Sequence, residues 1–335
     1  MVKAETWLKV TKKGLYCIPG DFYIDPHSGV NRAVVTHGHS DHARPGHQST
    51  LATPETLAIA SLRMGKSAWK RTQAIKFGES IRLGSVDVKL VPAGHVLGSA
   101  QVVMEYKGNR VVVSGDYKRR PDPTCAPFEV VHCDIFITEA TFALPVFRHP
   151  ADQNEVNKLL KSVAQNPDRT HLVGVYALGK AQRLMALLRA AGYEQPLYLH
   201  GALNGVTNLY HEFGITLGDL RAVSQENKRQ LSGAIVLAPP SATNDRWSRG
   251  FVDPLISFAS GWMRIRQRAR QRGVELPLIL SDHADWDELT DTIQAVYAEE
   301  IWVTHGREDA LVHYAQSKGI RARALSMIGY GEEDE

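Results

Sequence analysis

The sequence predicts an α/β protein in which both ends of the chain build one metal-binding domain around a smaller inserted domain. A loop rich in metal-ligating side chains follows an apolar, β-branched run at residues 33–36. Strand and helix patterns alternate from about 150 to 255, and ligand-type residues return at 281–285 and 303–306. We therefore expect one domain from residues 1–150 and 256–335, with residues 151–255 inserted as a parallel α/β unit.

The loop after residue 36 contains four good metal ligands in six positions: His37, His39, Asp41 and His42. Side chains 37, 39 and 41 of an extended segment point the same way, and a turn after 41 can bring His42 to the same pocket. Three imidazoles and a carboxylate are more than one tetrahedral ion needs from a single loop, because the rest of the fold also contributes. Two adjacent metal ions are the natural interpretation.

Three further strands end at residues that can bind metal or protons. His95, Asp116 and Glu139 each follow an apolar run, and separate strand ends can deliver such groups to one pocket. The expected strands cover 22–25, 33–36, 86–91, 101–106, 110–114 and 134–138, and the expected helices cover 54–64 and 153–165. In the inserted part we expect strands at 171–176, 196–200 and 234–238 and helices at 179–191 and 203–213. Asp285 is expected to cap a helix over 287–297.

Composition limits the class of protein. The chain has 335 residues, of which 43% are hydrophobic and 22% charged, as in ordinary globular proteins. No apolar run approaches the length that spans a bilayer, and we expect a cytoplasmic protein. Its three cysteines lack CxxC spacing, so we expect reduced thiols. A net charge of +3 permits an anionic polymer as substrate without demanding one.

The chain resembles the metallo-β-lactamase superfamily in four motifs: Thr36 to His42, Ala-Gly-His95, Ser-Gly-Asp116 and Thr-His305-Gly. It further resembles the β-CASP nuclease branch in three: Thr-Glu139-Ala-Thr-Phe, Ser-Asp-His283-Ala-Asp and residues 176–184. Within that branch, residues 44–47, 259–263 and 280–286 are similar to bacterial ligase-associated DNA exonucleases. The resemblance covers nearly the whole chain. Lys180 stands where many RNA-processing relatives carry arginine, which weakens an RNA-specific interpretation.

The resemblance implies a four-layer αββα metallo-β-lactamase fold with an inserted β-CASP domain, and it implies roles for the ligands. His37, His39 and His95 hold one ion, Asp41, His42 and His305 hold the other, and Asp116 bridges them. Mixed imidazole and carboxylate ligation suits zinc best, while the carboxylates leave manganese as an activator. Two such ions, with Asp41, His283 and Glu139 as catalytic residues, clamp a phosphodiester for in-line displacement.

Two acidic residues are expected to orient histidines. Asp25 follows an apolar run before the ligand loop and is expected to accept a hydrogen bond from a ligand histidine, although an ordinary Asp-Pro turn is an equal alternative. His283 lies outside the metal set. Held by a carboxylate such as Glu139, it can contact the scissile phosphate or donate a proton to the leaving oxygen. A purely structural histidine is the alternative.

Substrate contacts are expected from the residues Lys180, Ser99, Trp262, Arg264 and Arg268. Lys180 opens a helix, whose N-terminus favours phosphate. The stretch 262–272 is strongly basic, and arginines on a helix can track a phosphate backbone while Trp262 stacks on a base. A solvated basic helix is the equal alternative.

These features predict a metal-dependent exonuclease that acts on single-stranded DNA or DNA ends. Its expected partners are an ATP-dependent DNA ligase and a helicase of a repair system, with no membrane partner. Two alternatives stay open: an RNA-processing β-CASP ribonuclease, and a small-molecule thioester or lactone hydrolase. The inserted domain, Glu139 and His283 disfavour the hydrolase, because a compact hydrolase does not need them.

Overall fold

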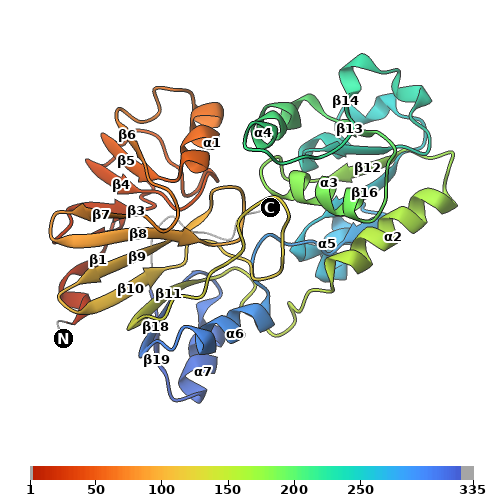
Figure 1. Ribbon diagram of the computed structural model, residues 1–335. Coiled ribbons are helices and arrows are strands. Elements are labelled where there is room, and N and C mark those ends of the chain that lie inside the picture. The colour runs from red at the N-terminus through yellow and green to blue at the C-terminus, as the bar shows by residue number, and fades with distance from the viewer. Residues whose placement is uncertain (1–2, 326–335) are drawn as a thin grey trace. The chain divides into compact units, whose positions relative to one another are not determined.

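The computed structural model describes residues 3–325, which fall into two compact units (Figure 1). The first unit comprises Met1–Arg148 and His283–Glu335, and the second comprises His149–Asp282. Each unit has its own sheets, and they are described separately. Among the described residues, no helix has the length and apolar character needed to cross a membrane.

The first unit contains two mixed sheets. One has the strand order β1-β2-β3-β4-β5-β6, with bounds Leu8–Thr11, Gly14–Cys17, Phe22–Ile24, Arg32–Val34, Ser49–Ala52 and Thr72–Ala74. The other has the order β19-β18-β11-β10-β9-β8-β7. The bounds of β7 to β11 are Ser80–Leu83, Val86–Pro92, Ala100–Tyr106, Asn109–Val113 and Ile135–Ala140, and those of β18 and β19 are Glu300–Gly306 and Arg321–Ala324.

Strand alternation divides the core of this unit into separate apolar clusters. Val111 and Val113 of β10 lie in a cluster with residues of both sheets, including Leu15 and Ile24. Val112, between them in sequence, lies in another cluster with α6 (Trp286–Ala295) and α7 (Glu308–Ser317). A third cluster joins β4 and β5 to α1 (Pro54–Met64). Successive side chains of β10 point to opposite faces of the sheet, and both faces are apolar because both are covered.

The second unit is a parallel α/β structure, as the alternating pattern predicts. Its sheet has the order β14-β13-β15-β12-β16-β17, and every pair of neighbours is parallel. The bounds of β12 to β17 are His171–Gly174, Leu197–Leu199, Leu220–Ala222, Ile235–Ala238, Leu255–Ala259 and Leu276–Leu278. The helices are α2 (Asp152–Gln165), α3 (Lys180–Ala190), α4 (Gly201–Glu212) and α5 (Arg266–Gln271).

The second unit extends further along the chain than the range 151–255 expected from the sequence. Strand β16 begins at Leu255 and pairs with β12 from His171 onward, and β17 pairs with β16 in turn. Residues 256–282 therefore belong by their contacts to this unit. Residues 255–259 are not among the strands expected from the sequence, and the sheet that this run joins is fixed by pairing far along the chain.

A single helix over 262–272 is not formed. Residues Gly261–Arg264 form a short 3₁₀ helix, Ile265 is extended, and α5 begins at Arg266. Arg264 and Arg268 therefore do not share one helical face, contrary to what their spacing of four suggests. The β-branched Ile265 and the packing of Trp262 and Met263 in the interior override the helix propensity of the arginines.

Candidate metal centre

The histidine loop leaves the end of β4 and turns back over the first unit. Thr36 and His37 are fully buried, and His39 and Asp41 are partly exposed. Gly115 has φ +57 and lies so close to Thr36 that an added Cβ would be 2.9 Å from its side chain. Glycine at this position lets the backbone before Asp116 approach the histidine loop, and the Ser-Gly-Asp sequence thereby brings Asp116 to the ligands.

The first group of ligand atoms comes from three histidines and a carboxylate: His37, His39, His95 and Asp116. These atoms lie within 4.8 Å of one another. The Nδ1 atom of His39 is 3.1 Å from Nε2 of His37 and 3.0 Å from Nε2 of His95. Ring nitrogens from three imidazoles thus converge on one small volume, which is the arrangement that a tetrahedral N/O ligand set requires.

A second group is formed by Asp41, His42 and His305. The Nε2 atom of His42 lies 3.2 Å from Oδ2 of Asp41 and 3.3 Å from Oδ2 of Asp116. The other oxygen of Asp116, Oδ1, lies 3.7 Å from Nδ1 of His305. Asp116 therefore faces both groups with its two oxygens. His305 has φ +57, an uncommon conformation that directs its ring into the group.

The donor set fits divalent cations. Oδ1 of Asp41 and Oδ1 of Asp116 are buried and accept no hydrogen bond from the residues described. A buried carboxylate oxygen without a donor is costly unless a cation compensates it. Five imidazoles and two carboxylates in two neighbouring groups supply enough ligands for two ions, and nitrogen with carboxylate oxygen suits zinc or manganese.

Electrostatics at the site also favour metal binding. Burial lowers the pKa of His37 and His95 well below the ordinary value, and it lowers the pKa of His305 to about 4. These imidazoles are therefore neutral at pH 7, the state that binds a metal. Burial also acts to lower the pKa of His42, but the carboxylates of Asp41, Asp116 and Asp25 raise it well above the ordinary value. The pocket thus attracts positive charge.

Asp25 orients His42. Its carboxylate accepts hydrogen bonds from Nδ1 of His42 at 2.8 Å and from the backbone N and Oγ1 of Thr36 at 2.8 and 2.6 Å. Because Nδ1 is engaged, Nε2 of His42 is the nitrogen that faces Asp41 and Asp116. Asp25 itself has φ +42, so the chain turns sharply before the ligand loop.

We expect Asp25→Asn to lower metal affinity roughly 10- to 100-fold, the usual effect of losing a carboxylate that orients a ligand histidine. The amide cannot accept from all three donors as a carboxylate does, so His42 loses its fixed orientation. Metal titration against a competing chelator measures the affinity. Asp21→Asn, an exposed aspartate in the preceding turn, is the matched control and should leave the affinity unchanged.

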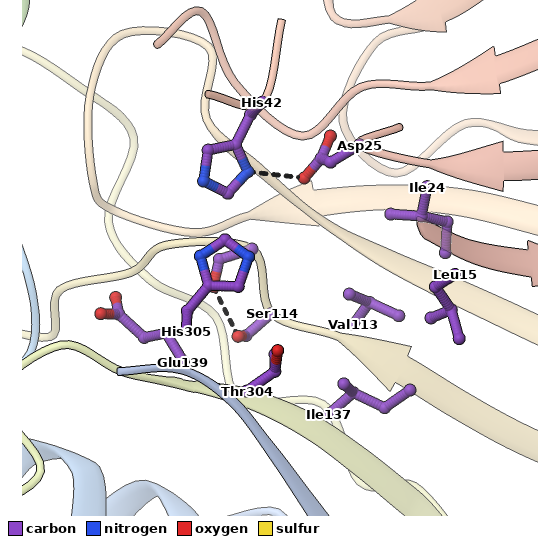
Figure 2. Close-up of a pocket in the computed structure, with 11 residues that line it drawn as sticks. Leu15, Ile24, Asp25, His42, Val113, Ser114, Ile137, Glu139, Thr304 and His305 are labelled. Atoms are coloured by element: carbon purple, nitrogen blue, oxygen red, sulfur yellow. Dashed lines mark hydrogen bonds and ion pairs between the residues drawn. The ribbon is translucent and has the colours of Figure 1, made fainter. Parts of the chain in front are cut away.

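A cavity of about 30 Å³ lies beneath the second ligand group (Figure 2). Asp25, His42, Glu139 and His305 lie on its polar side, and its apolar side is made by Leu15, Ile24, Val113 and Ile137. The volume has room for one or two water molecules. The candidate metal centre therefore borders the apolar core between the strands, where a low dielectric strengthens charge interactions.

His283 and Glu139 form a buried pair. Nδ1 of His283 lies 3.0 Å from Oε2 of Glu139, and the other oxygen of Glu139 accepts the backbone N–H of Tyr117 at 2.7 Å. The His283 ring is 4.7 Å from the ring of His95. Burial raises the pKa of Glu139, and His283 opposes that shift. The pair can therefore hold and pass a proton beside the ligand groups.

Two anchors of the site carry no motif signal in the sequence. Lys118 is fully buried, pairs with Asp122 at 2.6 Å and donates to the carbonyl of His95 at 3.4 Å. Arg120 bonds Asp285 at 3.1 Å and Glu288 at 3.2 Å, and so ties the Asp116 loop to the start of α6. The N-capping role expected for Asp285 is confirmed.

Ser99, expected among the substrate contacts, is buried in the turn that carries His95. Its hydroxyl accepts the backbone N–H groups of His95 and Val96 at 3.0 and 3.1 Å. The contacts of Ser99 therefore shape the ligand turn rather than form an open surface.

The expected substrate residues of the second unit differ in exposure. Lys180 is buried, with its ammonium 4.6 Å above the ring of Tyr176 and 3.8 Å from Asp282. Trp262 is also buried, and the guanidinium of Arg268 covers its ring at 4.0 Å. Stacking of a base on Trp262 would require Arg268 to move. Arg264 is exposed.

Comparison with known proteins gives nuclease and ligase relatives. A protein named "Probable DNA ligase" from Opitutus terrae is 27% identical over 96% of this chain and 31% of its own length. An endoribonuclease from Gibberella zeae is 30% identical over 42% of the chain and 17% of its own length. A ribonuclease from Thermus thermophilus is 23% identical over 93% of the chain and 89% of its own length. The chain thus spans less than a third of the length of each of the first two relatives.

No family model matches the chain. A crystal structure of a protein of unknown function from Enterococcus faecalis superimposes with a TM-score of 0.58 at 14% identity, covering 88% of this chain and 79% of that one. That likeness concerns the fold alone. The relatives confirm the similarity to β-CASP nucleases of the metallo-β-lactamase superfamily that the motifs predict.

Proposed function

We propose that the chain is a β-CASP nuclease that hydrolyses the phosphodiester bonds of single-stranded DNA or DNA ends with two divalent metal ions. The observation that carries this proposal is Asp116, which faces both ligand groups. In this proposal the first unit has the four-layer αββα metallo-β-lactamase fold and the second is the β-CASP domain. The three apolar clusters of the first unit support such layering.

We infer that His37, His39 and His95 hold one ion, that Asp41, His42 and His305 hold the other, and that Asp116 joins them. Zinc is the proposed resident metal and manganese an activator. When bound, such ions polarise the phosphodiester and lower the pKa of water at the site. Asp25 keeps His42 oriented, while Lys118 and Ser99 hold the turn of His95.

His283 has the proposed role of contacting the scissile phosphate or giving a proton to the leaving oxygen. Its Nδ1 is engaged by Glu139, which fixes the ring beside the ligand groups. Glu139 is fixed in turn by the N–H of Tyr117, so the ring of His283 has one preferred orientation. A pair of this kind beside the ligand groups is more than a thioester or lactone hydrolase needs, and it supports the nuclease proposal.

One relative supports the proposed DNA substrate and partners. The relative named as a DNA ligase matches nearly the whole chain, which supports action on DNA beside an ATP-dependent ligase, with a helicase as a further proposed partner. Relatives named as ribonucleases favour the RNA alternative. The ligand set alone does not distinguish these substrates, because both polymers present the same phosphodiester.

The proposal predicts degradation of end-labelled single-stranded DNA from an end, with little cleavage of RNA of matched sequence. Chelation with EDTA should abolish activity, and zinc or manganese should restore it. Product mapping on gels is the measurement, and a circular single strand of the same sequence is the matched control that an exonuclease leaves intact. Faster cleavage of the RNA would favour the ribonuclease, and cleavage of the circle would contradict exonuclease action.

A further inference from the structure

The connection from α1 to β6 concentrates positive charge that the proposed metal chemistry does not use. Residues 56–78 contain five basic side chains and no acidic one: Arg63, Lys66, Lys70, Arg71 and Lys76. All five are exposed. Because the whole chain has a net charge of only +3, acidic residues outnumber basic ones outside this segment. The positive charge is therefore local.

The segment is fixed in place by the interior of the first unit. Trp69 is buried in the cluster that joins β4, β5 and α1, and its Nε1 donates to the carbonyl of Arg44 at 2.7 Å. The ring of Trp69 stacks on His47 with the two planes 16° apart. An exposed basic segment with a buried aromatic anchor presents its charges with little loss of conformational entropy on binding.

The same segment runs directly alongside the metal-ligand loop. Arg63 donates from Nη1 to the carbonyl of Gly38 at 2.7 Å, and Gly38 lies between His37 and His39. Further on, the backbone N–H of Lys70 donates to the carbonyl of His47 at 3.1 Å. The basic segment thus starts beside the candidate metal centre and leads away from it toward the edge strand β6, which Figure 1 shows at the border of its sheet.

Three cations of the segment lack an acidic partner. Within residues 3–325, Lys66, Lys70 and Arg71 make no ion pair with an acidic side chain. Two exposed cations elsewhere in the first unit are paired: Arg82 with Asp87, and Arg110 with Glu105. Several unpaired cations on one fixed segment raise the local potential and favour a polyanion.

We propose that Arg63, Lys66, Lys70 and Arg71, here called the basic edge, bind the phosphate backbone of a single DNA strand whose end is at the metal centre. The proposal rests on the proposed nuclease function and adds to it the path of the uncleaved strand. A single strand fits because several cations on one segment can contact successive phosphates, and backbone contacts of this kind need no particular base sequence.

The test compares two triple variants of the full chain with metals bound. Lys66→Gln, Lys70→Gln and Arg71→Gln together remove charge from the basic edge. The matched control is the triple variant Lys9→Gln, Lys12→Gln and Lys107→Gln, which removes the same charge from exposed lysines. Lys9 and Lys12 lie at β1, the edge strand opposite β6 in the same sheet, and Lys107 lies in the turn after β9. Binding of a 20-nucleotide phosphorothioate strand, which resists cleavage, is measured over a range of salt concentrations.

The basic-edge variant should bind the strand roughly 10- to 50-fold more weakly near physiological salt. The slope of the logarithm of the binding constant against the logarithm of the salt concentration should become less steep by about 2, since each lost phosphate contact contributes about 0.7 on a single strand. The control should keep the wild-type affinity and slope. For cleavable substrates, kcat/KM should fall for a 20-nucleotide strand and stay near normal for a dinucleotide and for a bis-nitrophenyl phosphodiester.

Equal affinity and slope in the basic-edge variant and wild type would overturn the proposal. An equal loss in both triple variants would also overturn it, because the effect would then be one of net charge alone. Loss of bis-nitrophenyl ester hydrolysis in the basic-edge variant would show damage to the ligand loop and would count against it too. Failure of the wild type to cleave any DNA would instead reject the proposed function, which the binding experiment does not test.

Discussion

The variant Asp116→Ala is expected to show no cleavage of DNA above background and to lose most of its bound metal. Asp116 directs Oδ2 toward His37 and His42, at 3.5 and 3.3 Å, and Oδ1 toward His305 at 3.7 Å. No other carboxylate among the described residues faces both ligand groups. Removing it deprives both sites of a ligand and leaves the surrounding imidazoles without their shared negative charge.

Metal analysis by mass spectrometry should show occupancy falling from near two ions per chain, and a cleavage assay on end-labelled DNA should show the loss of turnover. Asp87→Ala, an exposed carboxylate of the same unit, is the control and should behave like wild type. Circular dichroism shows whether the variant is folded. A folded Asp116→Ala protein with two ions and most of its activity would refute the bridging role.

The second large effect is expected for His283→Ala, which should keep both ions and lower turnover by roughly 10²- to 10⁴-fold. His283 belongs to a group with Asp116 and Glu139, but the two proposed ligand sets do not include it. Its loss removes a positioned acid or phosphate contact and leaves the ligands in place. His313→Ala, an exposed histidine on α7, is the matched control.

One further substrate, the bis-nitrophenyl phosphodiester, and one further variant separate the roles of His283. A nitrophenyl leaving group needs no proton, so a general acid predicts a small effect of His283→Ala on that ester, while a phosphate contact predicts a large effect on both substrates. Glu139→Gln combined with His283→Ala should be no worse than His283→Ala alone, because Glu139 acts through His283. Loss of an ion in His283→Ala would make His283 a ligand and require His305 to be reassigned.

The spacing of the ligand residues in the sequence predicts those parts of the site that depend on local backbone geometry. His37, His39, Asp41 and His42 share one loop, and strand ends deliver His95 and Asp116, so the convergence of these groups follows from periodicity and strand order. The expected strands and helices of the first 250 residues are formed to within a few residues.

Contacts between distant segments are the part that the sequence does not predict. Lys118 and Arg120 look like ordinary polar residues until the fold places them against His95 and α6. The extent of the second unit depends on the pairing of β16 with β12, and the cover on Trp262 depends on the turn at Ile265. Such features are set by tertiary packing, which overrides local propensity.

The two-metal centre can be tested most directly by anomalous X-ray diffraction from crystals of the zinc-loaded protein. We expect two zinc peaks, one among His37, His39 and His95 and one among Asp41, His42 and His305, with the carboxylate of Asp116 between them. A single peak, or peaks away from these side chains, would contradict the two-metal account and the nuclease mechanism that depends on it.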